Sequence, residues 1–167
     1  MRLEAEEAER EAARSAAMRR SFREVAAELM AHGDTVRVGL ATGETLQGEI
    51  RHVGIDYLSI ETPTRRFDVR LEAITLLEVA VRALQGGRSP SRDQAPGWRA
   101  RLLELELSGS TVDVATCSAE EWTGKVTQVG SDHLCLTSRP ERRERFLPFA
   151  AVAFVAATDS RSGDADD

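Results

Sequence analysis

The chain has 167 residues, of which 41% are hydrophobic and 30% are charged, and its net charge is −6. This length accommodates one ordinary domain or two small ones, and the composition is sufficient for a core with much solvated surface. The negative charge is concentrated at the two ends and the middle is nearly neutral, which argues against the whole-domain basic field that drives nucleic-acid binding.

Targeting signals and cysteines bear on the cellular compartment. No apolar run approaches the roughly 20 residues of a membrane-spanning helix, and the N-terminus has acidic residues where a secretory signal would be apolar. We therefore expect a cytoplasmic protein without membrane contact. Cys117 and Cys135 lack metal-site spacing, so we expect two reduced thiols and no disulfide.

The N-terminal part of the chain is predicted to be helical. Residues 1–18 contain good helix formers but hardly a large apolar side chain, so we expect a solvated helical extension. Residues 19–84 begin with an amphipathic pattern that predicts a second helix. Its apolar face contains Phe22, Val25, Ala26 and Leu29.

Five short strands are predicted in the rest of the segment 19–84. Val36, Val38 and Leu40 alternate with other residues in the first of them, and the same period of two recurs in the following strands. Each strand therefore has one apolar face. A helix followed by five strands is the expected structure of this segment.

The same pattern recurs in the second half of the chain. A stretch rich in Gly, Pro and Ser, residues 85–96, is expected to be a linker, and 159–167 a disordered acidic tail. Between them, 97–158 predicts a helix over 97–107 and five more strands. Residues 33–62 align with 109–138 without a gap, and ten of these thirty positions are identical. We interpret the chain as an internal duplication.

Repeated glycines explain how each set of strands is expected to curl into a closed barrel. Gly48 and Gly124 lie midway along the longest strand of each half, where a side chain would obstruct curvature. In the repeated phrase "VGxD", Gly54 and Gly130 are expected to supply a positive φ. Asp56 and Asp132 are expected to accept hydrogen bonds from local amides of the turn.

The segment "VRVGLATGETLQGEIRHVGIDYLSIE" and its counterpart resemble the first motif of Sm-like proteins, the LSm and Hfq-type small barrels. The whole arrangement also resembles uncharacterised proteins of high-GC Gram-positive bacteria. This resemblance implies a mainly β fold of two tandem five-stranded SH3-like or Sm-like barrels, each preceded by a helix. Phe22 and Trp98 are interpreted as the helix anchors that seal each barrel.

The resemblance also has consequences for binding and assembly. Sm-like RNA binders clasp a base with residues that this chain replaces with Ser59, Cys135 and the segments "RRFD" and "RERF". Sm-like barrels associate through the edges of their fourth and fifth strands, and Pro148 is expected to weaken one such edge. We therefore expect a monomer with paired barrels or a loose homodimer, and not a closed ring.

The candidate contact residues lie in equivalent loops of the two halves. Clustered arginines can grip phosphates, although loops at a barrel rim are ordinarily polar and solvated. An aromatic residue after the "VGxD" turn can stack on a base or be simply an exposed turn residue. The candidates are Arg65, Arg66 and Tyr57 in the first half and His133, Arg142, Arg143 and Arg145 in the second.

These observations predict a non-catalytic interaction or scaffolding module with an unknown protein partner. The alternative is an RNA-binding post-transcriptional regulator of the Sm-like type, which would take single-stranded RNA. An enzyme with an unfamiliar site ranks third, because no Ser, Cys or carboxylate lies in a nucleophile or phosphate-loop motif. No catalytic residue, cofactor or metal site is predicted.

Overall fold

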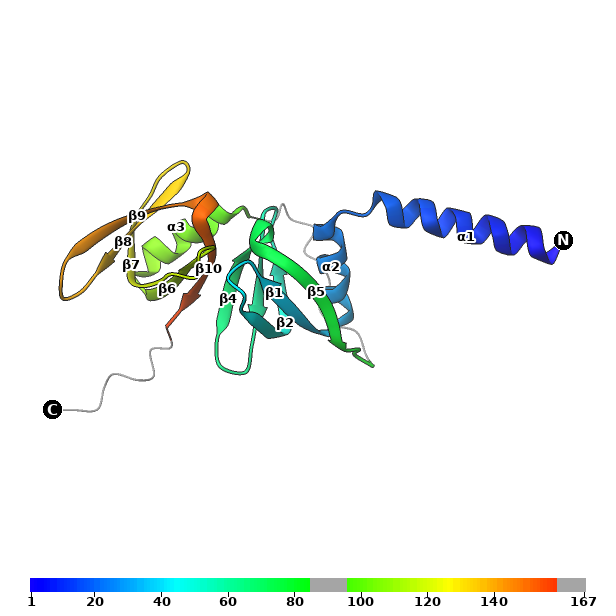
Figure 1. The fold of residues 1–167 in the computed structure, drawn as a ribbon, viewed down its shortest axis with the longest axis horizontal. Coiled ribbons are helices and arrows are strands. Elements are labelled where there is room, and N and C mark those ends of the chain that lie inside the picture. The colour runs from blue at the N-terminus through cyan, green and yellow to red at the C-terminus, as the bar shows by residue number, and fades with distance from the viewer. Residues whose placement is uncertain (85–95, 159–167) are drawn as a thin grey trace.

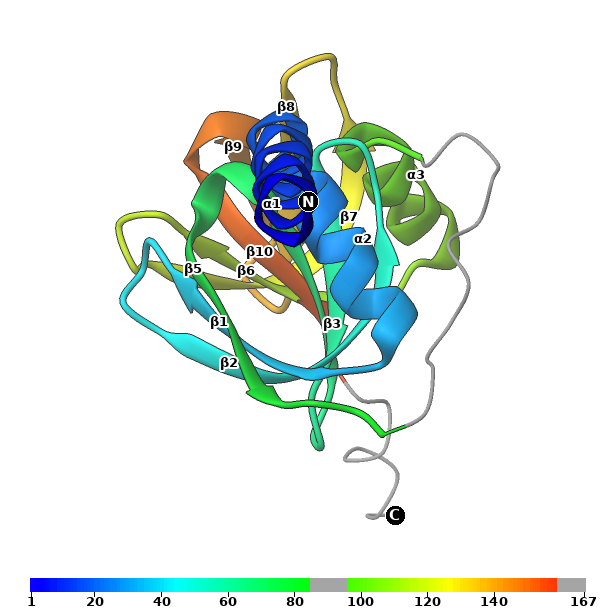
Figure 2. The same ribbon diagram turned by 90° about the vertical axis from the view of Figure 1, so that its right-hand side faces the viewer.

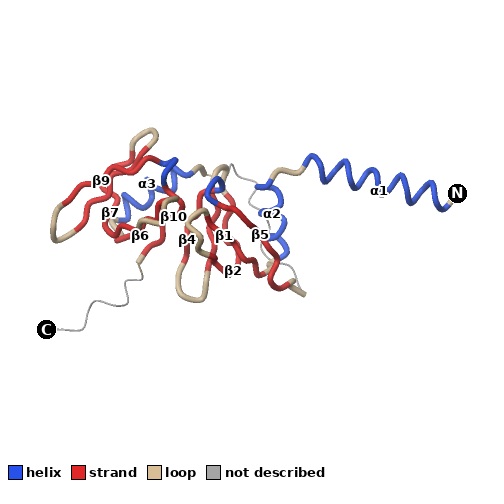
Figure 3. The backbone as a smooth tube through the Cα atoms, viewed as in Figure 1, coloured by secondary structure: helices blue, strands red, loops and turns tan. Residues whose placement is uncertain are grey.

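The computed structural model describes residues 1–84 and 96–158. Its described part contains three α-helices and ten β-strands, so the prediction of a mainly β protein with helices before the strands is confirmed (Figures 1 and 3). The predicted linker, apart from Pro96, and the predicted tail lie outside the described residues.

Helix α1 (Arg2–Arg19) stands apart from the rest of the molecule. None of its residues is buried, and Figure 1 shows it projecting away from the sheet. It ends at Arg19, and the backbone of the next residue, Arg20, is extended, so α1 and α2 (Phe22–His32) are two separate helices. Ser21 caps α2 in a reciprocal capping box with Glu24, which satisfies two otherwise free amides.

The strands follow the helices in the same order in both halves. In the first half, α2 precedes β1 (Thr35–Leu40), β2 (Thr45–Val53), β3 (Tyr57–Glu61), β4 (Arg66–Arg70) and β5 (Ile74–Val81). In the second half, α3 (Trp98–Ser108) precedes β6 (Thr111–Thr116), β7 (Glu121–Val129), β8 (His133–Ser138), β9 (Arg143–Pro148) and β10 (Val152–Ala157). A single 3₁₀ turn precedes the last strand of each half.

All ten strands belong to one antiparallel sheet with the order β5-β1-β2-β3-β4-β10-β6-β7-β8-β9. The sheet is not closed, which differs from the expected pair of closed barrels. Within each half the strand order is that of a strongly curved sheet, but β4 pairs with β10 of the other half instead of with β5. Figure 2, turned by 90°, shows the strands of the first half wrapping around beside α2.

Gly48 and Gly124 lie in the long strands β2 and β7, where neighbouring strands approach closely. A Cβ atom at Gly48 would overlap the carbonyl oxygen of Glu61, and one at Gly124 would lie 2.5 Å from the carbonyl oxygen of Thr137. A register shift follows two residues later in each strand. Glycine is therefore required at both positions because the paired backbone leaves no room for a side chain.

The explanation predicted for the "VGxD" glycines is wrong. Neither Gly54 nor Gly130 has a positive φ. A Cβ atom at Gly54 would instead overlap the ring of Tyr57, and one at Gly130 would lie 2.8 Å from Nδ1 of His133. These positions are glycine because an aromatic ring packs over the backbone, and not because the turn needs a left-handed residue.

Candidate functional site

The two halves meet where β4 pairs with β10, and α3 lies against the same region (Figure 1). The ladder consists of three residue pairs: Val69 with Phe154, Asp68 with Val155, and Phe67 with Ala156. We call this contact the joint. On the side of the first half it comprises β3, β4 and the turn before β3, and on the side of the second half α3 and β10.

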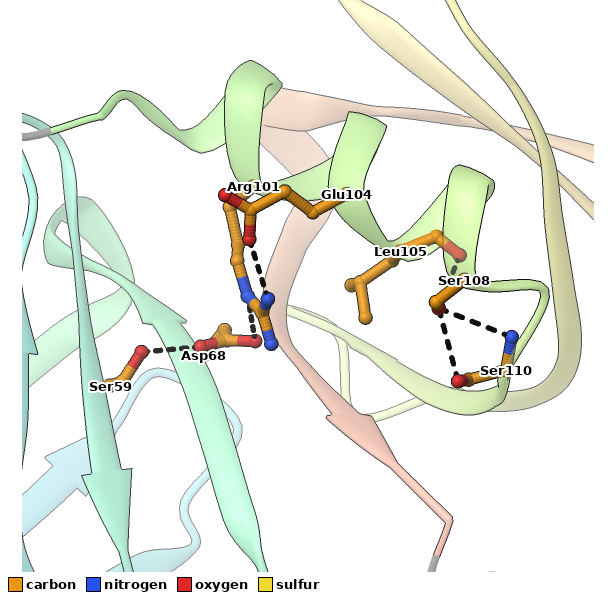
Figure 4. A network of polar contacts seen from close by, with 7 residues as sticks. All are labelled: Ser59, Asp68, Arg101, Glu104, Leu105, Ser108 and Ser110. Carbon is orange, nitrogen blue, oxygen red and sulfur yellow. Dashed lines mark hydrogen bonds and ion pairs between the residues drawn. The ribbon is translucent and has the colours of Figure 1, made fainter.

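A partly buried polar network lies in the joint (Figure 4). Arg101 of α3 donates from Nε to Oδ2 of Asp68 at 2.9 Å and from Nη1 to Oε2 of Glu104 at 2.8 Å. Ser59 of β3 donates its hydroxyl to the other carboxylate oxygen of Asp68. Asp68 and Ser59 are buried, and the bonds from Ser59 and Arg101 offset the cost of burying the charge of the Asp68 carboxylate. Removing one of these partners would leave the buried carboxylate uncompensated.

An aromatic contact lies beside this network. Trp98, the first residue of α3, packs edge-on against Tyr57 of β3, with ring centroids 5.9 Å apart. The amide of Trp98 donates to Oδ1 of Asp56 at 2.6 Å, so the Asp56 side chain caps a helix of the other half, which differs from the expected hydrogen bonds to amides of its own turn. Burial, assisted by the charge of Asp68, raises the pKa of Tyr57 to about 12.

His52 lies next to Tyr57 at the edge of the joint. Its ring centroid is 5.7 Å from that of Tyr57. Burial, and then the positive charge of Arg66, lower the pKa of His52 below its ordinary value. The described geometry therefore favours a neutral imidazole at this position.

Arg65 is the candidate contact residue that the structure places in the joint. It donates from Nη1 to Oδ2 of Asp113 at 2.9 Å and from Nη2 to the carbonyl oxygen of Ala156 at 3.3 Å. Its guanidinium carbon also lies 5.0 Å from the ring centroid of Phe67. Arg65 of the first half thus forms two hydrogen bonds with residues of the second half. Both bonds are made within the chain.

The other candidate arginines occupy different surroundings. Arg66 and Arg142 are exposed, and Arg143 pairs with Glu141 at 3.1 Å. Arg145 lies 4.3 Å above the ring of Trp122. Because β4 is in the middle of the sheet and β9 at its end, the two arginine groups lie in different parts of the molecule and do not form one cluster.

The two aromatic candidates differ in exposure, although their positions in the sequence are equivalent. Tyr57 is buried, so the expectation of an exposed turn residue is wrong for it, because Trp98 of the other half covers its ring. His133 keeps 39% of its side chain exposed, and its Nδ1 donates to Oδ1 of its neighbour Asp132 at 2.9 Å. Trp98 belongs to the core of the second half as well as contacting Tyr57, as predicted for a helix anchor, whereas Phe22 is exposed and does not match that prediction.

Asp68 and Arg101 were missed by the sequence reasoning. Asp68 alternates with apolar residues in its strand, which is the pattern of a solvent-facing position. Nothing in the local sequence indicates that a second unit covers that face. Arg101 gives only a weak signal, because it is one of two arginines, with Arg99, in the first turn of α3.

The free edges of the sheet are the remaining surface of interest. Strand β5 ends the sheet on one side and β9 on the other. Large apolar side chains are exposed on both strands, namely Leu76 and Val81 on β5 and Phe146 on β9. Unpaired strand edges with exposed apolar side chains are typical sites of strand addition.

Comparisons with known proteins add no family assignment. No protein-family model matches the chain, and no curated protein sequence matches it. Among the described residues, no helix has the length and apolar character needed to cross a membrane. Cys117 and Cys135 are both free, and Cys135 is buried.

Proposed function

We propose that the chain is a non-catalytic interaction module built by duplication of an Sm-like small barrel. Backbone contacts at matching positions support the duplication: the amide of Gly54 bonds the carbonyl of Tyr57 at 2.7 Å, and that of Gly130 bonds His133 at 2.8 Å. The amides of Leu71 and Phe149 likewise bond the carbonyls of Asp56 and Asp132. The two halves thus use the same turns in the same places.

The observation that carries the interaction function is the exposure of Phe146 and Leu76 on the two unpaired edges. Phe146 is more than half exposed on an edge strand, so a large apolar side chain is left in contact with water. Covering it with a partner would remove this apolar area from water, which is favourable. We therefore assign the edges β5 and β9 as the binding surfaces. The protein acts by strand addition, with main-chain hydrogen bonds and apolar side chains as the contacts.

The alternative, binding of single-stranded RNA, has its own supporting observation. A hollow on the second half is lined by Lys125, Arg139 and the hydroxyls of several threonines. The matching hollow of the first half contains Glu49 and Glu61, which both pair with Arg51, so its lining has one more acidic than basic group and is less suited to phosphate. Exposed Arg142 and Arg143 follow Arg139 in the chain.

One experiment separates the two functions. Labelled single-stranded RNA is titrated with the full chain at low and at physiological salt, next to a variant with Lys125, Arg139, Arg142 and Arg143 changed to Ala. The interaction module predicts no RNA binding in either salt. Binding at micromolar or lower concentration that weakens steeply with salt and disappears in the variant would overturn the proposal in favour of RNA.

A further inference from the structure

One face of helix α1 carries apolar side chains at its two ends and charged side chains between them. Leu3, Glu7, Arg10, Arg14 and Met18 recur at intervals of three and four residues, so they share this face. All five are exposed, and Leu3 and Met18 are 74% and 81% accessible. We call this surface the α1 face.

The α1 face has nothing packed on it within the described chain. None of the residues of α1 is buried, and its N-terminus has no side-chain cap. Figures 1 and 2 show α1 projecting from the rest of the molecule. Because most helical stability in proteins comes from packing and not from propensity, a partner lying along α1 would stabilise it.

The charges of α1 are separated along its length. Residues 2–9 contain one Arg and four Glu, a net charge of −3, whereas residues 10–19 contain three Arg and one Glu, a net charge of +2. An antiparallel copy of α1 would bring the acidic half against the basic half and would oppose the two helix dipoles, and both effects are favourable. A parallel copy would place like charges together. The charge distribution therefore fits a second copy of the same helix in the antiparallel direction.

We propose that α1 pairs through the α1 face with α1 of a second copy of the chain, antiparallel and related to it by a two-fold axis. In the register that places Leu3 opposite Met18 of the second copy, Glu7 lies opposite Arg14 of the second copy. The two-fold axis repeats both contacts. This surface is separate from the edges β5 and β9, so the inference does not rest on the proposed function.

The second copy would also relieve repulsion within each helix. Glu7 and Glu11 are four residues apart, as are Arg10 and Arg14, and like charges at this spacing destabilise a helix. Each charge opposite Glu7 or Arg14 in the pair has the other sign. Across the contact the charges alternate, first on one copy and then on the other, in the order Arg10, Glu7, Arg14, Glu11.

The shape of the molecule leaves room for this pairing. Helix α1 is about 27 Å long and points away from the sheet (Figure 1), so an antiparallel pair places the two sheets at opposite ends. A single pair of such helices buries less than the roughly 1,200 Å² of a stable interface. We therefore expect a weak contact that strengthens at low salt, where charges are screened least.

The test is the mass of the full chain, measured by light scattering over a concentration series at low and at high salt. We expect the mass to rise with concentration from 18.3 kDa towards twice that value, and to rise less at high salt. Glu7→Arg and Arg14→Glu each put like charges at both contacts, so each should raise the midpoint concentration by about tenfold. A mixture of these two variants has opposite charges at both contacts and should associate as the wild type does.

Glu9→Arg is the matched control. It makes the same change of charge as Glu7→Arg, but about 200° further around the helix, so its association should equal that of the wild type. Circular dichroism establishes that each variant keeps its helix content.

Disulfide cross-linking tests the direction of the two helices. Chains carrying Leu3→Cys should cross-link with chains carrying Met18→Cys when the two are mixed. Chains carrying only Leu3→Cys should not cross-link with one another through the new cysteine, because these positions lie about 22 Å apart in the antiparallel pair.

Four outcomes overturn the inference. The first is a wild type that remains monomeric at its highest soluble concentration in low salt. The second is equal loss of association in Glu7→Arg and Glu9→Arg, and the third is cross-linking of Leu3→Cys chains to one another, which indicates a parallel pair. The fourth is association that Glu7→Arg leaves intact and Phe146→Asp abolishes, because that result locates the contact at β9 and leaves the proposed function standing.

Discussion

Positions 54 and 130 require glycine because an aromatic ring lies over the backbone at each of them. The two rings differ in how freely they can move. The ring of Tyr57 is held by Trp98 on its other side, and the carbonyl oxygen of Pro96 also lies 2.6 Å from where a Cβ atom at Gly54 would be. The ring of His133 is partly exposed and can turn into solvent. The same substitution should therefore have different costs at the two positions.

We expect Gly54→Ala to lower the free energy of unfolding by about 1–3 kcal/mol, because a fixed ring and a backbone oxygen must move. Gly130→Ala serves as the matched control and is expected to cost less than about 1 kcal/mol, since its ring can rotate away. Urea denaturation followed by tryptophan fluorescence measures both. Equal losses at the two glycines would contradict this account of the joint.

At the scale of elements, the joint is held by a helix and a strand edge acting together. The β4–β10 ladder has only three residue pairs, but α3 adds the Arg101–Asp68 ion pair and the Trp98–Tyr57 contact. Tyr57 is the chain's single tyrosine, so its ionisation reports on the joint without interference from another phenol.

The raised pKa of Tyr57 has a defined consequence for alkaline stability. Between pH 10, the ordinary value, and about 12, the folded chain binds a proton that the unfolded chain has lost, so stability falls as pH rises through this window. Absorbance at 295 nm should show the phenolate appearing near pH 12 in the folded protein and near pH 10 in urea. Ionisation near pH 10 in the folded state would show that α3 does not cover Tyr57.

The strands and the helices could be predicted from the sequence because their periods depend on local residues. The alternation of Val36, Val38 and Leu40 indicates a strand whatever lies beside it. The pairing of β4 with β10 leaves no such pattern, because the sequence of a strand does not indicate which other strand its edge pairs with. The burial of Asp68, and with it the role of Arg101, follows only from that pairing and could not be predicted.

At the scale of the whole molecule, one contact of the joint has no counterpart at the free edges of the sheet. Arg65 bonds Asp113 in the joint, whereas the residues at the corresponding positions, Arg143 and Arg37, are both basic. Each of these two arginines is paired within the chain, Arg143 with Glu141 and Arg37 with Glu78.

In the variant Arg37→Asp, the exposed ion pair between Arg37 of β1 and Glu78 of β5 would become a repulsion between two carboxylates. We expect this variant to lower the free energy of unfolding by up to about 1 kcal/mol, and the control Arg37→Ala to fall between it and the wild type. Urea denaturation measures all three, and an Arg37→Asp variant as stable as the wild type would contradict this pairing.

Placing β4 and β10 on one polypeptide gives their contact a very high effective concentration, of the order of millimolar for segments tethered by a short connection. The contact inside the chain is thus saturated however dilute the protein is. A partner on a separate chain has no such tether, so its binding at the free edges β5 and β9 would depend on the concentrations of both proteins.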